Sequence, residues 1–231
     1  MKYNHVLSGT FLQRPNRFIA HVLIDGKEEI CHVKNTGRCR ELLIPGCTVY
    51  CAVSGNPQRK TKFDLIAVGK KTENGTILVN MDSQAPNAAA KEWLKSGASL
   101  FGKLDVIKPE RKFGTSRFDF YLEKEKRKIF LEVKGVTLED NGVVLFPDAP
   151  TERGVKHVQE LIHCHGEGYE TYVLFVVQME RALYFTPNRK MHPQFADALC
   201  EAQNTGVHLL AFTCKVTPNE MTIDKKLKVS L

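Results

Sequence analysis

The chain has 231 residues, of which 42% are hydrophobic and 26% charged, a composition typical of a folded globular protein and not of a disordered one. Its 33 basic and 26 acidic side chains leave a net charge of +7, which permits an anionic partner such as nucleic acid without requiring one. No stretch approaches the ~20 apolar residues of a membrane-spanning helix. The first residues also lack a secretory signal, so we expect a cytoplasmic protein with no membrane partner.

The first 82 residues alternate short apolar runs with turn residues, which predicts a small all-β barrel. A β-hairpin is expected around Asp25-Gly26, and further turns at residues 35–37, 45–46 and 74–75. The number of strands fits an OB-fold-like domain over residues 1–82. The expected strands are residues 3–12, 18–24, 29–33, 47–53, 62–71 and 76–81.

From residue 83 onward, helical and strand patterns alternate, which predicts an α/β domain with a partly parallel sheet over residues 83–231. Thr151 is the expected N-cap of the central helix, whose apolar spacing ends at Gly166 or Gly168. Other helices are expected at 88–95 and 192–206. Strands are expected at 116–124, 127–139, 142–147, 170–179, 182–187 and 207–217, the last being the final strand.

The barrel carries most of the net positive charge, because its twelve basic and seven acidic residues among the first 82 leave +5 of the total +7. OB-folds bind single-stranded nucleic acid through a basic groove with aromatic platforms. The alternative is that the aromatic residues belong to the core and that the charges only solvate the surface. The candidates for nucleic-acid contact are Arg14, Arg17, Lys34, Arg38 and Arg40, together with Phe11, Phe18 and Tyr50.

The hairpin expected over residues 116–139 carries the residues with the clearest chemistry. Glu132 and Lys134 share one face of their strand, and Asp119 can meet them across the pair. Charges in apolar strands are costly unless they are paired or bound to metal. Asp119, Glu132 and the carbonyl of Val133 therefore form a candidate site for Mg²⁺ or Mn²⁺. Lys134 would assist hydrolysis of a phosphodiester beside it.

The spacing from Asp119 to Glu132 and Lys134 resembles that of the PD-(D/E)xK, or restriction-endonuclease-like, nucleases. Phe118 stands where that pattern usually has proline, which is a mild departure. The alternative is an ordinary salt bridge on a solvated strand, between Lys134 and either acidic residue.

The segment Leu145–Gly154 runs into the central helix and adds further candidates. Arg153, Lys156 and His157 lie on the first helical turns, where phosphate also finds free backbone N–H groups. Arg117, next to the expected metal ligand, is a further basic candidate. Asp148 precedes the helix and either caps it or contributes to the site.

Several motifs together resemble the sugar fermentation stimulation protein A family over essentially the whole chain. They are residues 32–46, 78–87, 116–122, 130–138, 146–161 and 184–188. The resemblance implies an N-terminal OB-like domain and a C-terminal domain of the restriction-endonuclease-like fold. It also implies DNA binding with a regulatory link to sugar (maltose) metabolism. Glu110 and Glu92 then compete for the place of a further acidic metal ligand.

Two functions stay open at this point. The first is a metal-dependent nuclease, because a pure binding module has no reason to place Asp119, Glu132 and Lys134 together. The second is a non-catalytic DNA-binding regulator, in which the acidic pair is structural. We expect nucleic acid, and DNA first, as the partner, and a homodimer is an open alternative for the oligomeric state.

Cysteine usage argues against a disulfide framework. The chain has seven cysteines, an odd number without regular spacing, which indicates reduced thiols. A zinc site built on Cys47 and Cys51 would need a second pair of ligands, and His163 and His165 lie far along the chain. A structural zinc is therefore disfavoured.

Overall fold

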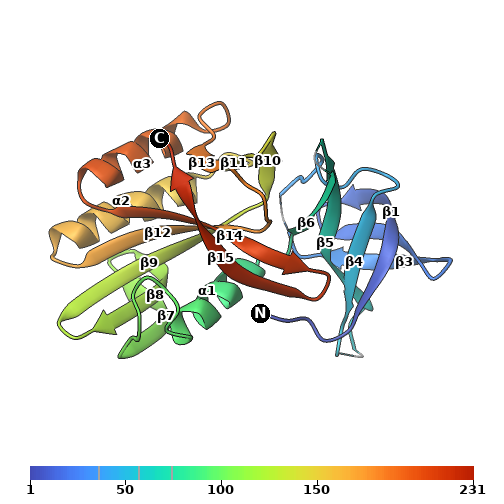
Figure 1. The fold of residues 1–231 in the computed structure, drawn as a ribbon, viewed down its shortest axis with the longest axis horizontal. Coiled ribbons are helices and arrows are strands. Elements are labelled where there is room, and N and C mark those ends of the chain that lie inside the picture. Colours follow the sequence, from blue (N-terminus) through green and yellow to red (C-terminus); the bar gives the residue numbers. More distant parts are fainter. Residues whose placement is uncertain (36, 57, 74) are drawn as a thin grey trace.

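The computed structural model describes residues 1–35, 37–56, 58–73 and 75–231, so Thr36 and Asn74 of the expected turns lie outside the described residues. Within the described residues, the strands form a six-stranded sheet and a nine-stranded sheet (Figure 1). No helix of this part of the chain has the length and hydropathy needed to cross a bilayer.

The first sheet is closed into a barrel. Its strands are β1 (Val6–Asn16), β2 (Ile19–Ile24), β3 (Lys27–Val33), β4 (Thr48–Val53), β5 (Phe63–Thr72) and β6 (Gly75–Asn80). They pair in the order β3-β2-β1-β4-β5-β6, and a parallel pairing of β3 with β5 closes the circle. The predicted hairpin is confirmed, since Asp25 and Gly26 both have positive φ, of 49° and 77°, as a tight two-residue turn requires.

The second sheet runs in the order β10-β11-β13-β15-β14-β12-β9-β8-β7. Its strands are β7 (Val106–Phe113), β8 (Ser116–Lys124), β9 (Arg127–Val136), β10 (Leu138–Asp140), β11 (Val143–Phe146), β12 (Glu170–Val177), β13 (Tyr184–Pro187), β14 (His208–Thr217) and β15 (Glu220–Val229). The prediction of a partly parallel sheet is confirmed, because β9, β12 and β14 are parallel neighbours at its centre.

In the part of the chain that the structure describes, three helices cover the two faces of this sheet. They are α1 (Ala85–Lys95), α2 (Glu152–Gly166) and α3 (Pro193–Asn204). Helices α2 and α3 pack against each other on one face, and α1 lies on the other (Figure 1). Strand β12 is buried on both faces, with Phe175 in the cluster on the α2 side and Leu174 in the cluster on the α1 side. The predicted cap is also confirmed, since the Thr151 hydroxyl accepts from the N–H of Gly154 at 3.1 Å.

Two strands were not expected from the sequence. The prediction that residues 207–217 form the final strand is wrong, because β15 follows it and pairs antiparallel with β14 and parallel with β13. Its exposed centre, Asp224 to Lys226, hides the apolar pattern that Met221 and Leu227 carry. Strand β7 is polar and contains Pro109, which is tolerated because β7 is the edge of the sheet.

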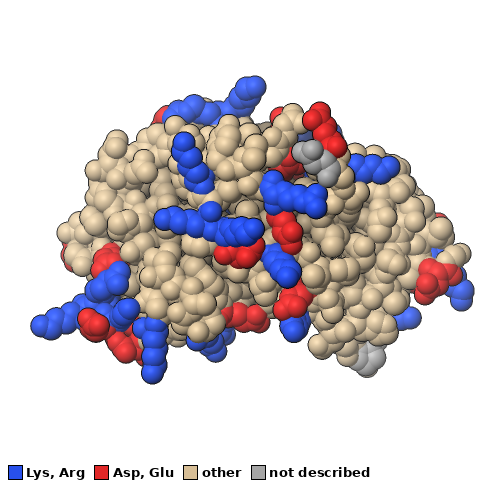
Figure 2. All heavy atoms as spheres, viewed as in Figure 1, with Lys and Arg blue, Asp and Glu red and all other residues tan. Residues whose placement is uncertain are grey.

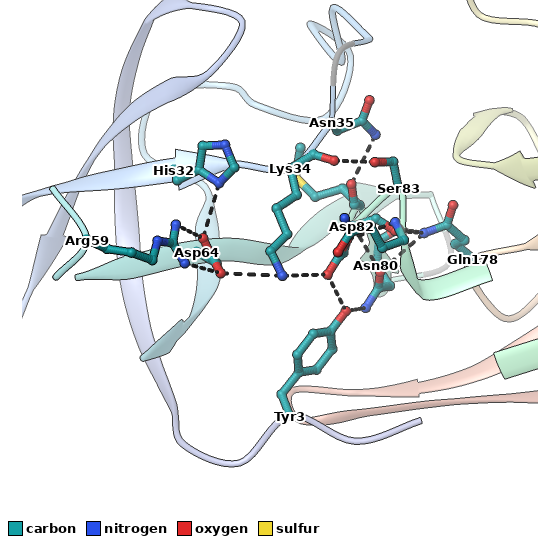
Figure 3. A network of polar contacts seen from close by, with 12 residues as sticks. Tyr3, His32, Lys34, Asn35, Arg59, Asp64, Asn80, Asp82, Ser83 and Gln178 are labelled. Carbon is teal, nitrogen blue, oxygen red and sulfur yellow. Dashed lines mark hydrogen bonds and ion pairs between the residues drawn. The ribbon is translucent and has the colours of Figure 1, made fainter. Parts of the chain in front are cut away.

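A buried polar network joins the barrel to the second sheet (Figure 3). The side-chain amide of Gln178, which follows β12, donates to the carbonyls of Asn80 and Asp82 at 2.9 and 3.2 Å. The Lys34 ammonium lies between the carboxylates of Asp64 and Asp82, 3.4 Å from each. Because buried charges must be paired to be tolerated, this network fixes how the two sheets meet.

The N-terminal segment adds a second connection between the two sheets. Before the chain enters the barrel at β1, the N–H of Tyr3 donates to the carbonyl of Asn219 in the β14–β15 turn, and its hydroxyl reaches Asp82 at 3.2 Å. The α-ammonium of Met1 forms an ion pair with Glu92 of α1 at 2.6 Å. The boundary near residue 82 stays a prediction, and residues 1–3 lie against the second sheet although they precede the barrel.

Candidate functional site

The predicted hairpin forms as β8 and β9, and, counted from the turn, the pairing between the two strands ends one residue before Asp119. The paired residues run from Lys124 and Arg127 at the turn to Phe120 and Leu131. Beyond that pair the regular alternation of side chains along β8 is lost. Phe118 and Phe120 are two residues apart and would share a face in a regular strand, but Phe118 packs on Phe130 on the α2 side of the sheet and Phe120 lies on the α1 side. The carboxylate of Asp119 is therefore free to face the backbone of β9.

Asp119 takes the place of a missing ladder partner. Its Oδ2 accepts from the N–H of Val133 at 2.8 Å, and its Oδ1 accepts from the side-chain amide of Asn87 on α1 at 2.7 Å. Burial and the negative charge of Glu132 raise the pKa of Asp119 to about 6, although these two hydrogen bonds oppose the rise. The site thus holds two mutually repelling carboxylates, an arrangement that a cation would relieve.

Glu132 is almost completely buried, with 2% of its surface exposed. One oxygen, Oε1, accepts from the ammonium of Lys134 at 2.6 Å and is 2.5 Å from Nδ1 of His157 on α2. Burial acts to raise the pKa of Glu132, but the hydrogen bond from His157 and the charge of Lys134 outweigh it and hold this pKa below its usual value. The other oxygen, Oε2, is buried and has no hydrogen-bond partner among the described residues.

The backbone of β9 contributes to the site as well. The N–H and C=O of one strand residue face the same neighbour, so the carbonyl of Val133 points to the edge where its N–H meets Asp119. Gly135, one residue after Lys134, allows α1 to approach closely. A Cβ at this position would lie 2.6 Å from Cγ of Pro86 and 2.5 Å from Oε1 of Gln178.

A divalent cation fits this donor set, although the residues do not form a complete metal cage. No group of three or more His, Cys, Asp or Glu side chains in the described part of the chain is arranged to hold a metal ion. Asp119, Glu132 and the Val133 carbonyl offer only oxygen, which suits a hard cation that keeps several waters. The Oε2 atom of Glu132 is buried without a hydrogen-bond partner among the described residues, so a bound cation would offset the cost of its burial.

The two competing acidic residues lie elsewhere. The Glu110 side chain is on the edge strand β7, is 70% exposed and lies 3.5 Å from Arg117. Glu92 is engaged with the N-terminal ammonium. Neither joins Asp119 and Glu132 in a three-residue metal group within the described residues. This placement leaves water as the natural source of the remaining ligands.

Four of the basic residues predicted in the barrel, Arg14, Arg17, Arg38 and Arg40, line a groove of about 630 Å³. Arg17, Arg38 and Arg40 are exposed there, and Arg38 and Arg40 form no ion pair with a described residue. The buried Cys39 between them has a positive φ of 46°, a local turn that allows its two neighbours to face solvent. These side chains are free to meet phosphate.

Arg14 and Lys34 have structural partners instead. The guanidinium of Arg14 lines the same groove but donates to four backbone carbonyls at 2.7–2.9 Å, those of Arg17, Asn35, Gly37 and Arg38. Lys34 serves the polar network of Figure 3. Both basic side chains hold the loop after β3 in place, a role that their charge alone did not indicate.

The aromatic candidates divide between core and surface. Phe11 belongs to the core, with 2% of its surface exposed, and Tyr50 is half-buried. Phe18 is 50% exposed in the β1–β2 turn, and the Arg17 guanidinium lies 5.8 Å from its ring centre. Only Phe18 is therefore placed to stack on a base. Lys60 and Lys62 in the β4–β5 loop are exposed as well, and OB-folds use this loop for binding, but no pattern in the sequence distinguishes them from other surface lysines.

The segment before α2 brings the groove and the acidic site onto one connected element. Ala149 lines the groove, and Asp148 approaches Gly37 so closely that a methyl group at Gly37 would collide with the carboxylate. Asp148 therefore abuts the barrel, while Thr151 caps the helix. Arg153 and Lys156 of α2 are exposed, whereas His157 is buried against Glu132 and is not a surface contact for phosphate.

Charges of both signs lie where the barrel meets the second sheet. On the face shown in Figure 2, acidic and basic side chains intermingle in the middle, where the two sheets meet. One pair at this junction is Lys70 of β5 with Glu139 of β10, both largely buried. The seven cysteines are free, and neither Cys47 nor Cys51 belongs to a metal-ligand group within the described residues.

Comparison with known proteins places the chain in a family. Residues 12–80 match the family model described as "SfsA N-terminal OB domain", and residues 84–220 match "Sugar fermentation stimulation protein RE domain". A sugar fermentation stimulation protein homolog from Desulfitobacterium hafniense (strain DSM 10664 / DCB-2) is 57% identical over 231 residues, covering 100% of this chain and 99% of the relative. A homolog from Clostridium beijerinckii is 54% identical and covers 100% of both chains.

A solved structure supports the same assignment. The structure of Pyrococcus furiosus SfsA in complex with Ca²⁺ matches with a TM-score of 0.88 and 27% identity, over 100% of this chain and 98% of that chain. The OB-fold predicted for the first domain agrees with the family model that matches it, and the closed strand order agrees with both. The chain belongs to the sugar fermentation stimulation protein family.

Proposed function

We propose that this protein is a metal-dependent phosphodiesterase that acts on nucleic acid, with a second domain of the restriction-endonuclease-like fold. One observation carries the proposal. Two donors hold Oε1 of Glu132, whereas its buried Oε2 has no partner among the described residues and lies in a site shared with Asp119. A structural salt bridge has no need of an open carboxylate oxygen or of a second carboxylate beside it.

The chemistry divides between the cation and the residues around it. A divalent cation, when bound, neutralises charge on the scissile phosphate and makes water more acidic. Asp119 and Glu132 would hold that cation, with the Val133 carbonyl as a further ligand. The Lys134 ammonium, 14% exposed and held by Glu132, is placed to stabilise the negative charge that develops on the phosphate.

The fold of the second domain supports this reading. A mixed sheet with α1 on one face and α2 on the other presents Asp119 and Glu132 at neighbouring strands β8 and β9. This is the arrangement expected from the spacing of the acidic residues. The Pyrococcus furiosus relative was solved with Ca²⁺, a cation that takes the same oxygen ligands as Mg²⁺.

The substrate class follows from the barrel groove. Arg17, Arg38 and Arg40 supply cationic contacts for a polyanion, and Phe18 offers an aromatic surface. The groove reaches Ala149, and the same segment leads into α2, whose His157 contacts Glu132. A nucleic acid in the groove would therefore be guided along this element toward the acidic site. DNA is the substrate that we propose first.

Cleavage of labelled single- and double-stranded DNA by the purified protein tests the proposal. We expect Mn²⁺- or Mg²⁺-dependent cleavage by the wild type, abolished by EDTA and in Asp119→Asn and Lys134→Met. The variant Asp224→Asn, which changes an exposed acid on β15, serves as a control and should cleave normally. Wild-type protein that is folded and metal-loaded but inert on both forms of DNA and on RNA would overturn the proposal.

The second candidate, a non-catalytic DNA-binding regulator of sugar (maltose) metabolism, is favoured by one feature of the barrel. Arg38 and Arg40 form no ion pair with a described residue, so the groove can bind phosphate without any help from the acidic site. Under this function the wild type and Asp119→Asn would bind DNA equally and neither would cleave it.

A further inference from the structure

We propose that His157 and Arg153 are positioning residues that orient Glu132 so that its Oε2 stays open toward a divalent cation. The inference rests on the proposed function, because it assigns these residues to the metal site of that function. It gives a buried histidine, expected from the sequence to face phosphate, a different role.

The tautomer of the neutral His157 ring follows from its neighbour on α2. Arg153 and His157 are four residues apart and so share one helix face, and Nε of Arg153 donates to Nε2 of His157 at 3.4 Å. A guanidinium can only donate, which makes Nε2 the acceptor and leaves the imidazole proton on Nδ1. That proton points at Oε1 of Glu132, 2.5 Å away.

The imidazole ring has little freedom to move. His157 is 7% exposed, and its ring meets that of Phe118 edge-on, with centres 6.1 Å apart and an angle of 74°. Helix α2 packs directly on β9, the strand that carries Glu132. The donor therefore comes from a rigid element that does not belong to the metal-bearing hairpin.

The two oxygens of Glu132 are left with different roles, one held by protein donors and the other available to a cation. Lys134 and His157 both act on Oε1, and no described residue hydrogen-bonds to Oε2. Lys134 is on the same strand as Glu132, and in the proposed function its ammonium is shared with the phosphate. His157 would then remain as the fixed donor that stops the carboxylate from rotating, in the way that outer partners orient metal ligands.

Calorimetric titration of the full-length protein with Mn²⁺, and separately with Ca²⁺, tests the inference. The variant His157→Ala should bind either metal about 10- to 100-fold more weakly than the wild type. His157→Asn should stay within a few-fold of the wild type, because the asparagine amide can donate from close to the position of Nδ1. Arg153→Ala removes the hydrogen bond that keeps the imidazole proton on Nδ1 of His157, and it should weaken metal binding by a smaller factor than His157→Ala does.

Controls separate this role from simple support of the fold. His163→Ala changes an exposed histidine on the same helix and should leave metal affinity unchanged. Thermal melts in EDTA establish that each variant is folded, and a purely structural role would lower the melting temperature without making alanine and asparagine differ in metal affinity. Folded His157→Ala with wild-type affinity, or asparagine no better than alanine, overturns the inference. Wild-type protein that binds neither metal overturns the proposed function itself.

Discussion

Replacing Asp119 by asparagine should make the metal-free protein more stable while it destroys the metal site. Burial and the charge of Glu132 raise the pKa of Asp119 from 3.8 to about 6. A shift of about 2 units corresponds to about 3 kcal/mol at ~1.36 kcal/mol per unit. This is the free energy that the ionised carboxylate costs the metal-free native state, and a neutral amide of the same shape avoids it.

The sign of the pH dependence follows from the same shift. The native pKa lies above the unfolded one, so the native state binds the proton more tightly. The stabilisation from protonated Asp119 is complete below pH 3.8 and is lost as the pH rises through about 6. The advantage of Asp119→Asn should therefore be small near pH 4, grow between pH 4 and 6, and level off at about 2–3 kcal/mol, since the amide makes weaker hydrogen bonds.

Thermal melts in EDTA between pH 4 and 8 measure this advantage, which corresponds to roughly 5–10 °C for a chain of this length. Mn²⁺ should then raise the melting temperature of the wild type and leave that of Asp119→Asn unchanged. Asp224→Asn, at an exposed position, should show no pH-dependent advantage. An Asp119→Asn protein that is less stable than the wild type at pH 8, or a difference that does not vary with pH, refutes this reasoning.

Three further variants probe other parts of the structure. Gly135→Ala should lower stability by about 1–3 kcal/mol in urea unfolding, because the new methyl group meets atoms at 2.5 and 2.6 Å, whereas Gly166→Ala, with open space around it, should be neutral or slightly stabilising. Lys34→Met should lower stability by a few kcal/mol and more at pH 8 than at pH 4, since it leaves two buried carboxylates facing each other; equal loss at both pH values would count against the network. Arg38→Ser should weaken DNA binding, measured by fluorescence anisotropy, and reduce the slope of log affinity against log salt concentration by about one, without a change in stability. Lys126→Ser, in the distant β8–β9 turn, should change neither the affinity nor this slope. Equal losses of affinity in both variants would mean that the groove is not the binding surface.

Local patterns were sufficient for most of the elements. The Asp25-Gly26 turn, the Thr151 cap and the doubly buried strand β12 each depend on a few neighbouring residues, and each is confirmed. Strand β15 could not be predicted because three successive charged residues interrupt its alternation of apolar and polar side chains. Its place between β13 and β14 is set by tertiary pairing. Such pairing leaves little trace in the strand itself.

The candidate site shows the same limit. The period of two in a strand predicts that Glu132 and Lys134 share a face, and they form the ion pair that this placement allows. It does not predict that β8 loses its alternation at Asp119, or that a histidine from α2 is buried on Glu132. The position of His157 near a helix start predicts a contact with phosphate, and only the packing of α2 on β9 assigns it to the carboxylate.

The sequence identifies the basic residues of the barrel but does not show which of them are structural and which are exposed for binding. Arg14 and Arg17 are three residues apart and chemically alike, yet one clamps four carbonyls and the other lies exposed beside Phe18. The difference depends on the loop after β3, which folds back over Arg14. No local pattern carries that information, so their roles separate only once the loop is in place.

Anomalous diffraction from crystals of the wild-type protein soaked in Mn²⁺ tests the central claim most directly. The account predicts one anomalous peak within bonding distance of Oε2 of Glu132 and of an Asp119 oxygen, absent from crystals of Asp119→Asn soaked in the same way. Oε1 of Glu132 should keep its contact with His157 in that structure. A peak elsewhere with this site empty, or no peak at Mn²⁺ concentrations that support cleavage, would contradict it.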